Sequence, residues 1–256
     1  KQLKKELQKT MQKLSKLNGH IAIGHVRYST TGGGGANNVQ PFSFNHYTGD
    51  FALAHNGNLV NSKELARYLE VRGSLFHSSS DSELLAHLIK KEKGEKNRID
   101  NIIEALNMLE GAFAFLIMTK NRIYACRDKH GLRPLSIGKL GDGYVISSET
   151  CALDIVGAEF IRDIEPGEVV TIDHHGIRSN YYSLYQRHLM CAMEYIYFAR
   201  PDSDIEGCNV HAFRKLSGRY LYEQSPIKAD VVIGVPDSSI SAAIGYSEAS
   251  GIPYEM

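Results

Sequence analysis

Three short motifs in the first third of the chain carry side chains suited to binding an amino acid amide. In HVRYSTTG, Arg27 presents a planar fork of donors for a small carboxylate. In SSSDSELL, Asp81 presents a carboxylate for an ammonium group. In AHNGNL, Asn56 and Gly57 supply an amide and a backbone N–H, the donor pair that an oxyanion hole requires. Together they predict a site that holds an α-amino acid amide and stabilises the oxyanion formed from it.

Each motif on its own has a simpler structural explanation. Arg27 would form a surface ion pair, Asn56-Gly57 would be a tight turn, and Asp81 would cap the helix that follows it. Only the combination of a cation, an anion and a donor pair is specific for the amide of an amino acid.

The hydrophobic periodicity indicates the elements that position these residues. Apolar residues at steps of three and four predict helices, and short apolar runs between turn residues predict strands. The predicted helices are 2–17, 62–72, 80–92 and 98–109, and the first predicted strands are 20–26 and 50–54, joined by a long Gly-rich loop.

A meander of short strands follows, from GAFAFLIMTK to VVTIDHHG, with a turn at Pro166-Gly167. After an irregular tract, a helix at 211–224, the apolar strand in ADVVIGVP and a further helix predict a parallel α/β unit. The pattern therefore places a domain boundary near residue 186.

Charge and composition favour an ordinary cytoplasmic protein. The sequence has 29 basic and 29 acidic residues, so it lacks the basic surplus that is typical of proteins that bind nucleic acid. It contains no apolar run long enough to span a membrane and no secretory signal pattern. Its four cysteines are widely spaced, which is typical of a reduced compartment.

HVRYST, AHNGN and the SSD element, in this order, resemble the glutaminase domains of N-terminal-nucleophile amidotransferases. The resemblance implies an α+β fold with four αββα layers, in which an N-terminal cysteine attacks the glutamine amide and releases ammonia. It implies that Arg27 and Asp81 clamp glutamine's α-carboxylate and α-amino groups, that Thr30 lines the site, and that Asn56 and Gly57 form the oxyanion hole.

The sequence departs from this family at its beginning. It starts with Lys1, and its first cysteine, Cys126, lies far beyond HVRYST. We therefore expect the glutaminase domain to be incomplete, with its upstream strands and nucleophile lost, and this chain by itself not to hydrolyse glutamine.

RDKHGLRPL, SSE at 147–149, MEYIYFARPDS and ADVVIGVPDSS resemble segments of amidophosphoribosyltransferases. This implies a glutaminase domain over 1–186 and, over 187–256, the start of a type I phosphoribosyltransferase domain. The implied parent enzyme makes phosphoribosylamine, glutamate and pyrophosphate from glutamine and phosphoribosylpyrophosphate in purine biosynthesis. It is expected to be a homo-oligomer inhibited by purine nucleotides.

Two further residues and one local ion pair follow from these segments. Ser238, at a predicted helix start, would contact nucleotide or cap the helix. Cys191 would be a ligand of a four-iron, four-sulfur cluster or a buried structural thiol. Mg²⁺ would accompany phosphoribosylpyrophosphate, and Asp128 and Arg133 are expected to pair locally within their turn.

Two alternatives remain open. The first three motifs alone would also fit another glutaminase of this class, such as the fructose-6-phosphate or glutamate synthase type. A chain that retains binding groups but lacks the nucleophile would also fit a non-catalytic ligand-binding module. The EYIYFARPDS and VIGVPDSS segments favour the amidophosphoribosyltransferase over the first of these.

Overall fold

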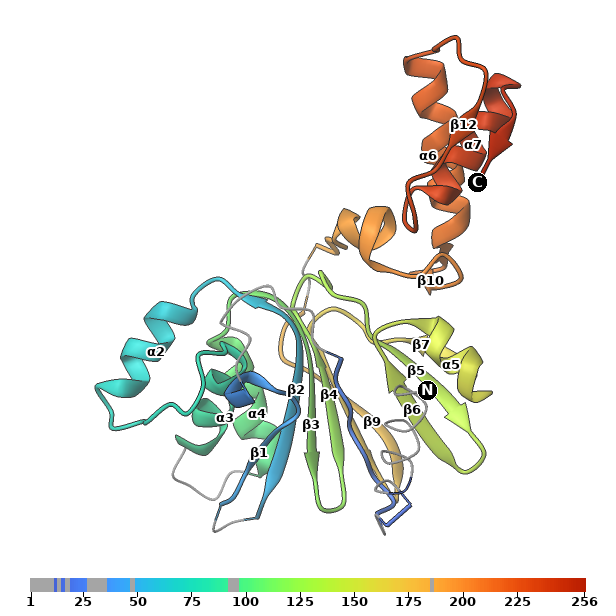
Figure 1. Ribbon diagram of the computed structural model, residues 1–256. Coiled ribbons are helices and arrows are strands. Elements are labelled where there is room, and N and C mark those ends of the chain that lie inside the picture. The colour runs from blue at the N-terminus through green and yellow to red at the C-terminus, as the bar shows by residue number, and fades with distance from the viewer. Residues whose placement is uncertain are drawn as a thin grey trace.

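A six-stranded antiparallel sheet is the centre of the fold (Figure 1). The computed structural model describes residues 12, 15–16, 19–26, 36–46, 49–91, 97–184 and 187–256. The strand order in the sheet is β1-β2-β3-β4-β8-β9. The strands are β1 (Phe42–Phe44), β2 (Phe51–Leu59), β3 (Gly111–Thr119), β4 (Ile123–Arg127), β8 (Glu168–Asp173) and β9 (Gly176–Tyr181), and a short 3-10 helix, η1 (Ala36–Asn38), precedes them.

Three helices cover one face of this sheet: α2 (Ser62–Glu70), α3 (Ser82–Lys91) and α4 (Arg98–Asn107) (Figure 1). Their apolar faces meet alternate residues of the strands, among them Phe113 and Phe115 of β3, in the larger hydrophobic core. The Asn97 side chain caps α4 by accepting from the N–H groups of Ile99 and Asp100.

A second sheet, of order β6-β5-β7, covers the other face. Its strands are β5 (Ser136–Leu140), β6 (Gly143–Ser147) and β7 (Glu159–Asp163), and α5 (Thr150–Val156) lies beyond them. Ala114, between Phe113 and Phe115, belongs to the core between the two sheets because successive strand residues point to opposite faces. The layers are thus helix, sheet, sheet and helix, which confirms the predicted αββα arrangement.

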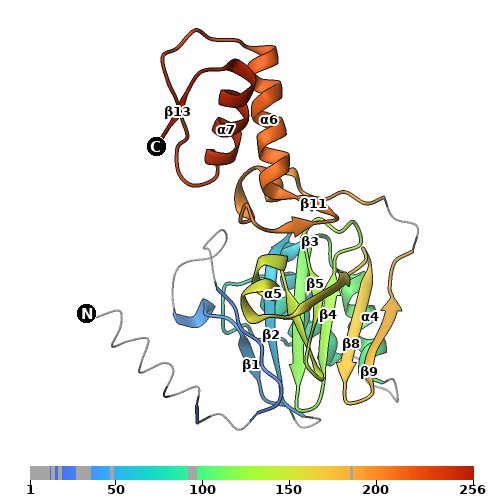
Figure 2. The ribbon, with the colours of Figure 1, turned by 90° about the vertical axis from the view of Figure 1, so that its right-hand side faces the viewer.

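The last quarter of the chain forms a separate unit beside the ends of the two sheets (Figure 2). Its two long helices pack closely, because Gly218 and Gly245 each bring backbone against the neighbouring helix; a Cβ on either would lie 1.9 Å from a carbonyl oxygen. The elements are η2 (Glu194–Phe198), β10 (Asp204–Ile205), β11 (Cys208–Asn209), α6 (Val210–Gln224), β12 (Val232–Ile233), α7 (Ile240–Ser250) and β13 (Tyr254–Glu255).

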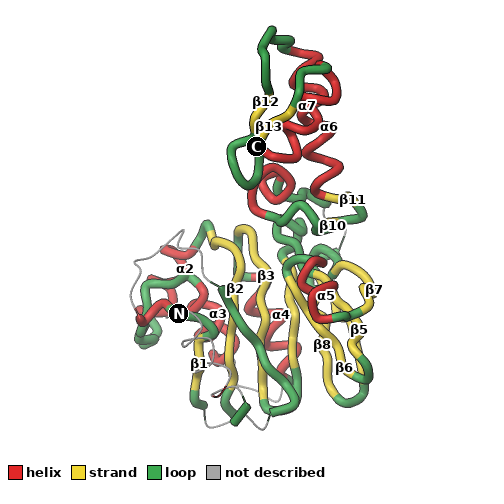
Figure 3. The backbone as a smooth tube through the Cα atoms, turned by 45° about the vertical axis from the view of Figure 1, so that its right-hand side comes forward, coloured by secondary structure: helices red, strands yellow, loops and turns green. Residues whose placement is uncertain are grey.

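β12 precedes α7 in the sequence and β13 follows it. The two strands pair in parallel, as a βαβ unit requires (Figure 3). The predicted parallel α/β character of this region is therefore confirmed. The strand itself is only Val232–Ile233, shorter than the apolar run in the sequence.

One expectation about elements was wrong, and several elements, α5 and β9 among them, were not predicted. Residues 20–26 are not a strand, because the described residues provide no neighbouring strand to pair their backbone groups. Helix α5 and strand β9 were missed, although Gly157 ends α5 in the left-handed conformation that often follows a helix. The predicted helix 2–17 falls almost entirely outside the described residues.

Candidate active site

Asn56 and Gly57 lie inside strand β2 and do not form a turn. Asn56 pairs with Ala114 and Gly57 with Phe113 of β3. Gly57 has φ +145°, and a Cβ there would lie 2.0 Å from the carbonyl oxygen of Ala112. Only glycine fits this close approach of two strands. The turn explanation for Asn-Gly is therefore wrong.

The alternation along β2 sends neighbouring residues to opposite faces. His55 stacks on Phe115, with ring centroids 4.1 Å apart, on the side of the helices. Its Nδ1 lies 2.9 Å from Oγ of Ser82 at the start of α3. Burial, together with the positive charges of His25 and Arg133, lowers the pKa of His55 to about 3, so its ring is neutral at pH 7. Asn56, one position on, faces the space between the two sheets.

Asp81 is attached to the same strand. Its Oδ2 accepts a hydrogen bond of 2.8 Å from the backbone N–H of Leu59. Burial raises the pKa of Asp81, while hydrogen bonds from Leu59 and Ser82 oppose that rise. The carboxylate thus lies near the oxyanion pair by direct contact with β2, in addition to its place before α3.

The serine-rich loop before Asp81 is organised by the buried carboxylate of Glu83. Glu83 accepts hydrogen bonds from the N–H groups of His77 and Ser78 and from the Ser78 hydroxyl, the last at 2.7 Å. Burial acts to raise the pKa of Glu83, but these hydrogen bonds prevail and lower it. Glu83 therefore fixes the loop that presents Asp81.

Replacing Glu83 by Gln is expected to lower the free energy of unfolding of this chain by about 1–2 kcal/mol at pH 7, because charge-assisted hydrogen bonds become neutral ones. A carboxyl with a depressed pKa stabilises the fold above its unfolded-state pKa, about 4.3, and loses that contribution as the pH falls through the folded-state value. The difference should therefore shrink as the pH falls below the unfolded-state pKa and through the lowered folded-state pKa of Glu83. Urea denaturation over a series of pH values from 7 downward, with the exposed Glu64→Gln as control, measures it; equal stabilities at pH 7 would contradict this role.

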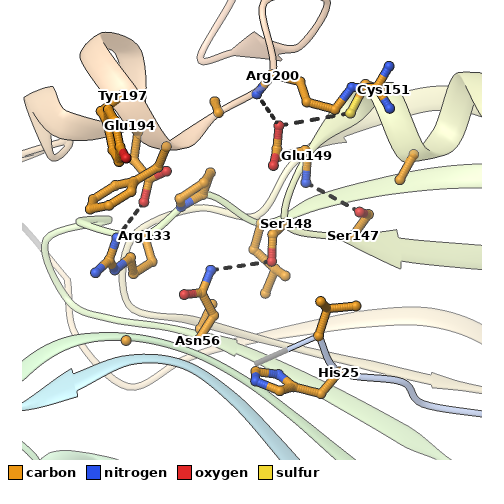
Figure 4. Close-up of a pocket in the computed structure, with 18 of the residues that line it drawn as sticks. His25, Asn56, Arg133, Ser147, Ser148, Glu149, Cys151, Glu194, Tyr197 and Arg200 are labelled. Carbon is orange, nitrogen blue, oxygen red and sulfur yellow. Dashed lines mark hydrogen bonds and ion pairs between the residues drawn. The ribbon is translucent and has the colours of Figure 1, made fainter. Parts of the chain in front are cut away.

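A cavity of about 1390 Å³ runs from this site to the C-terminal unit. Asn56, Gly57 and Asp81 line one part of it, and Asp237, Ser238 and Ser241 line another. Figure 4 shows the middle, where the Asn56 amide points toward Ser148; Nδ2 donates to Oγ of Ser148 at 3.5 Å. The space links the candidate oxyanion donors with the turn before α7.

Arg133 borders the cavity beside the junction between the two units. Its guanidinium donates to Oε1 of Glu194 at 2.6 Å (Figure 4) and lies over the ring of Phe198. Asp128 instead accepts from backbone groups of its own turn, including the N–H of Arg133. The expected local ion pair between Asp128 and Arg133 is therefore wrong, because the guanidinium has a buried carboxylate on η2 as its partner.

The structure brings together the predicted oxyanion-hole residues Asn56 and Gly57 and one predicted glutamine-binding residue, Asp81. Arg27 and Thr30 lie outside the described residues, although Gly24, His25 and Val26 immediately before them line the same cavity. Ser238 lies on the turn before α7, whose N-cap is Ser239.

Cys191 is a partly exposed free thiol just before η2. Within the described parts of the chain, no group of three or more His, Cys, Asp or Glu side chains is placed to hold a metal ion. The four-iron, four-sulfur assignment of Cys191 therefore has no ligand set among the described residues. None of the described helices has the length and apolarity needed to cross a membrane.

The glutamine amidotransferase domain family matches residues 25–154, about half of the chain. The chain therefore belongs to the glutamine amidotransferase family, and the matched region contains every residue predicted for glutamine binding.

The amidophosphoribosyltransferase of Bacillus subtilis (strain 168) is 57% identical over 244 residues, which are 95% of this chain and 51% of that protein. The enzyme of the same name from Staphylococcus aureus (strain MRSA252) is 50% identical over 236 residues, or 92% of this chain and 48% of that protein. The chain thus spans about half the length of these curated relatives. The resemblance to amidophosphoribosyltransferases that the motifs predicted is confirmed.

Two solved structures have a fold similar to that of this chain. A glutamine phosphoribosylpyrophosphate amidotransferase from B. subtilis, complexed with ADP and GMP, matches with a TM-score of 0.86 and 55% identity, over 91% of this chain and 50% of that one. A second, described as the allosteric regulatory enzyme of purine biosynthesis, matches over the same shares with a TM-score of 0.87 and 56% identity. The fold expected from the resemblance is therefore confirmed.

Sequence reasoning did not assign the polar residues that support the site. Glu83, His55 and Ser148 bear on Asp81 or Asn56, and each lies in a motif that was singled out for another residue. The contacts of His55 with Ser82 and of Ser148 with Asn56 join segments far apart in the sequence, so no local spacing reveals them. The contacts of Glu83 with His77 and Ser78 are local, but its position beside Asp81 was interpreted only as part of a helix start.

Proposed function

We propose that this chain forms the glutamine-binding part and the start of the transferase part of an amidophosphoribosyltransferase of purine biosynthesis. The observation that carries the proposal is the placement of Asn56, Gly57 and Asp81 around one cavity that continues to the turn before α7. In this proposal residues 1–186 belong to the glutaminase domain and 187–256 to the phosphoribosyltransferase domain.

The proposed glutaminase reaction uses an N-terminal cysteine that this sequence does not contain, since its first cysteine is Cys126. The thiolate attacks the side-chain amide carbon of glutamine, and the carbonyl oxygen becomes an oxyanion that accepts hydrogen bonds from Asn56 and Gly57. The C–N bond then breaks and ammonia leaves after protonation. Water hydrolyses the thioester to glutamate.

Asp81 and Arg27 would hold the substrate during these steps. The Asp81 carboxylate accepts from the α-ammonium group, Arg27 donates to the α-carboxylate, and Thr30 lines the site. Because Asp81 is bonded to Leu59 on the strand that carries Asn56, the ammonium site and the oxyanion site keep a fixed separation. This fixed separation places the side-chain amide carbon of glutamine beside the Asn56 and Gly57 donors.

In the second half-reaction, ammonia travels through the cavity and attacks C1 of phosphoribosylpyrophosphate, displacing pyrophosphate. The turn at Asp237 and Ser238, at the start of α7, would receive a phosphate-bearing ligand. Mg²⁺ bound with this substrate would neutralise charge on the leaving pyrophosphate. In the part of the chain that the structure describes, no group of three or more His, Cys, Asp or Glu side chains is placed to hold this ion.

Regulation, assembly and location extend the same proposal. One solved relative is complexed with ADP and GMP, which supports purine nucleotides as inhibitors. We further propose homo-oligomeric assembly, a cytoplasmic location and a role for Cys191 in a four-iron, four-sulfur cluster. Iron analysis of a Cys191→Ser variant in the full-length context described next tests the cluster.

The test uses a full-length chimaera in which this chain replaces the matching segment of the B. subtilis relative. We expect the chimaera to convert glutamine and phosphoribosylpyrophosphate to glutamate and pyrophosphate in equal amounts. Use of ammonium salts but not glutamine would contradict the glutaminase assignment.

The non-catalytic alternative is separated by calorimetry on the chain alone. Specific glutamine binding by residues 1–256, combined with a chimaera that is inactive with glutamine, would favour a ligand-binding module. The other glutaminase types are disfavoured, because the similarity to amidophosphoribosyltransferases continues past residue 154 to cover 95% of the chain.

A further inference from the structure

The SSE motif places a carboxylate at the boundary between the two units. Oε2 of Glu149 accepts a hydrogen bond from the backbone N–H of Arg200 at 2.8 Å (Figure 4). It also accepts one from the hydroxyl of Ser203 at 2.8 Å. Ser203 is fully buried. One carboxylate oxygen therefore fixes the ARPDS segment that leads from η2 toward α6.

The residue before Glu149 touches the candidate oxyanion donor. Oγ of Ser148 accepts from Nδ2 of Asn56, and both side chains line the cavity. The Asn56 amide has two hydrogens, so the contact with Ser148 leaves the second hydrogen for an oxyanion. Any shift of 148–149 would change the direction of that second N–H.

Two further hydrogen bonds hold the residues at this boundary in place. The Thr150 hydroxyl accepts from the N–H of Asp204 at 2.8 Å. The backbone N–H of Glu149 itself donates to Oγ of Ser147, at the end of β6. Glu149 is thus held on both sides: by the second sheet through its backbone and by the C-terminal unit through its carboxylate.

We propose that Glu149 is a positioning residue, which uses its contacts with Arg200 and Ser203 to hold Ser148 and thereby aim the Asn56 amide at the oxyanion. This rests on the proposed function. Its consequence is that the junction with the C-terminal unit sets the rate of the glutaminase step, while the groups that bind glutamine, such as Asp81, are left unchanged.

The test compares Glu149→Ala and Ser203→Ala in the chimaera. Each removes one side of the contact, and each is expected to lower kcat for glutamine hydrolysis about 10- to 100-fold, the scale of a small misplacement of a catalytic group. KM for glutamine should stay within about twofold, since binding does not depend on the amide direction. The double variant should lose no more than the stronger single variant, because both remove the same contact.

Asp154→Ala is the matched control, since Asp154 is an exposed carboxylate on the adjacent helix α5. It should behave as wild type. Ammonium-dependent synthesis should be unchanged in all variants, which separates this effect from damage to the transferase site. If Glu149→Ala fails to fold, Ser203→Ala alone decides the question.

Two outcomes would overturn the inference: kcat within about twofold of wild type in folded variants, or a rise in KM at unchanged kcat. A wild-type chimaera that synthesises product from ammonium but does not hydrolyse glutamine would instead contradict the proposed glutaminase function. The two failures are therefore distinguishable.

Discussion

Asn56→Ala in the chimaera is expected to lower kcat for glutamine hydrolysis about 100- to 1000-fold, with little change in KM, because an oxyanion donor acts only once negative charge develops. Asn56→Asp should have a similar effect. It keeps the shape of the side chain but removes the N–H₂ donors, so the fold of β2 is preserved. Steady-state kinetics of glutamate release measure both.

Asn121→Ala is a suitable control, because Asn121 is exposed in the turn between β3 and β4. It should leave both constants at wild-type values. If Asn56→Asp kept a kcat within about threefold of wild type, the assignment of Asn56 to the oxyanion hole would be wrong.

Asp81→Asn is expected to raise KM for glutamine about 30-fold or more, because the substrate ammonium loses its anionic partner in a largely buried site. The amide oxygen can still accept from Leu59, so the free energy of unfolding should stay within about 1 kcal/mol of wild type. Asp81→Ala loses both functions and should be less stable as well. Kinetics and urea denaturation of the two variants separate binding from folding.

The Asp81 assignment fails if Asp81→Asn leaves KM unchanged and only Asp81→Ala has an effect. In that case the carboxylate would serve the fold through its bond to Leu59 and not the substrate. This comparison also answers the question that the sequence left open, whether Asp81 is a helix-start residue or a ligand.

The sequence predicted much of the fold because its helices show clear periodicity. α2, α3 and α4 begin within two residues of the predicted positions, and α3 follows the Ser80-Asp81 signal directly. Strand pairing was harder. Residues 20–26 have the apolar alternation of a strand but no described partner, and no local pattern records whether a partner exists.

The candidate site was predicted by residue type, but its supports were not. Asn56-Gly57 has the composition of a tight turn, and only the close approach of β3 at Ala112 explains why glycine is needed inside a strand. Likewise, RDKHGLRPL suggested a local pair for Arg133, whereas its partner Glu194 is far away in sequence. Long-range contacts of this kind are set by packing and not by spacing.

The most direct test of the site is the affinity of the chimaera for an aldehyde analogue of glutamine, which forms a tetrahedral adduct with a cysteine nucleophile and so resembles the transition state. We predict that Asn56→Asp weakens inhibition by this aldehyde about 100-fold or more, while KM for glutamine barely changes. We predict that Asp81→Asn raises the inhibition constant of the aldehyde and the KM for glutamine by the same factor, because both molecules carry the α-ammonium group. If Asn56→Asp left aldehyde inhibition unchanged, the assignment of the oxyanion hole, and with it the proposed active site, would be contradicted.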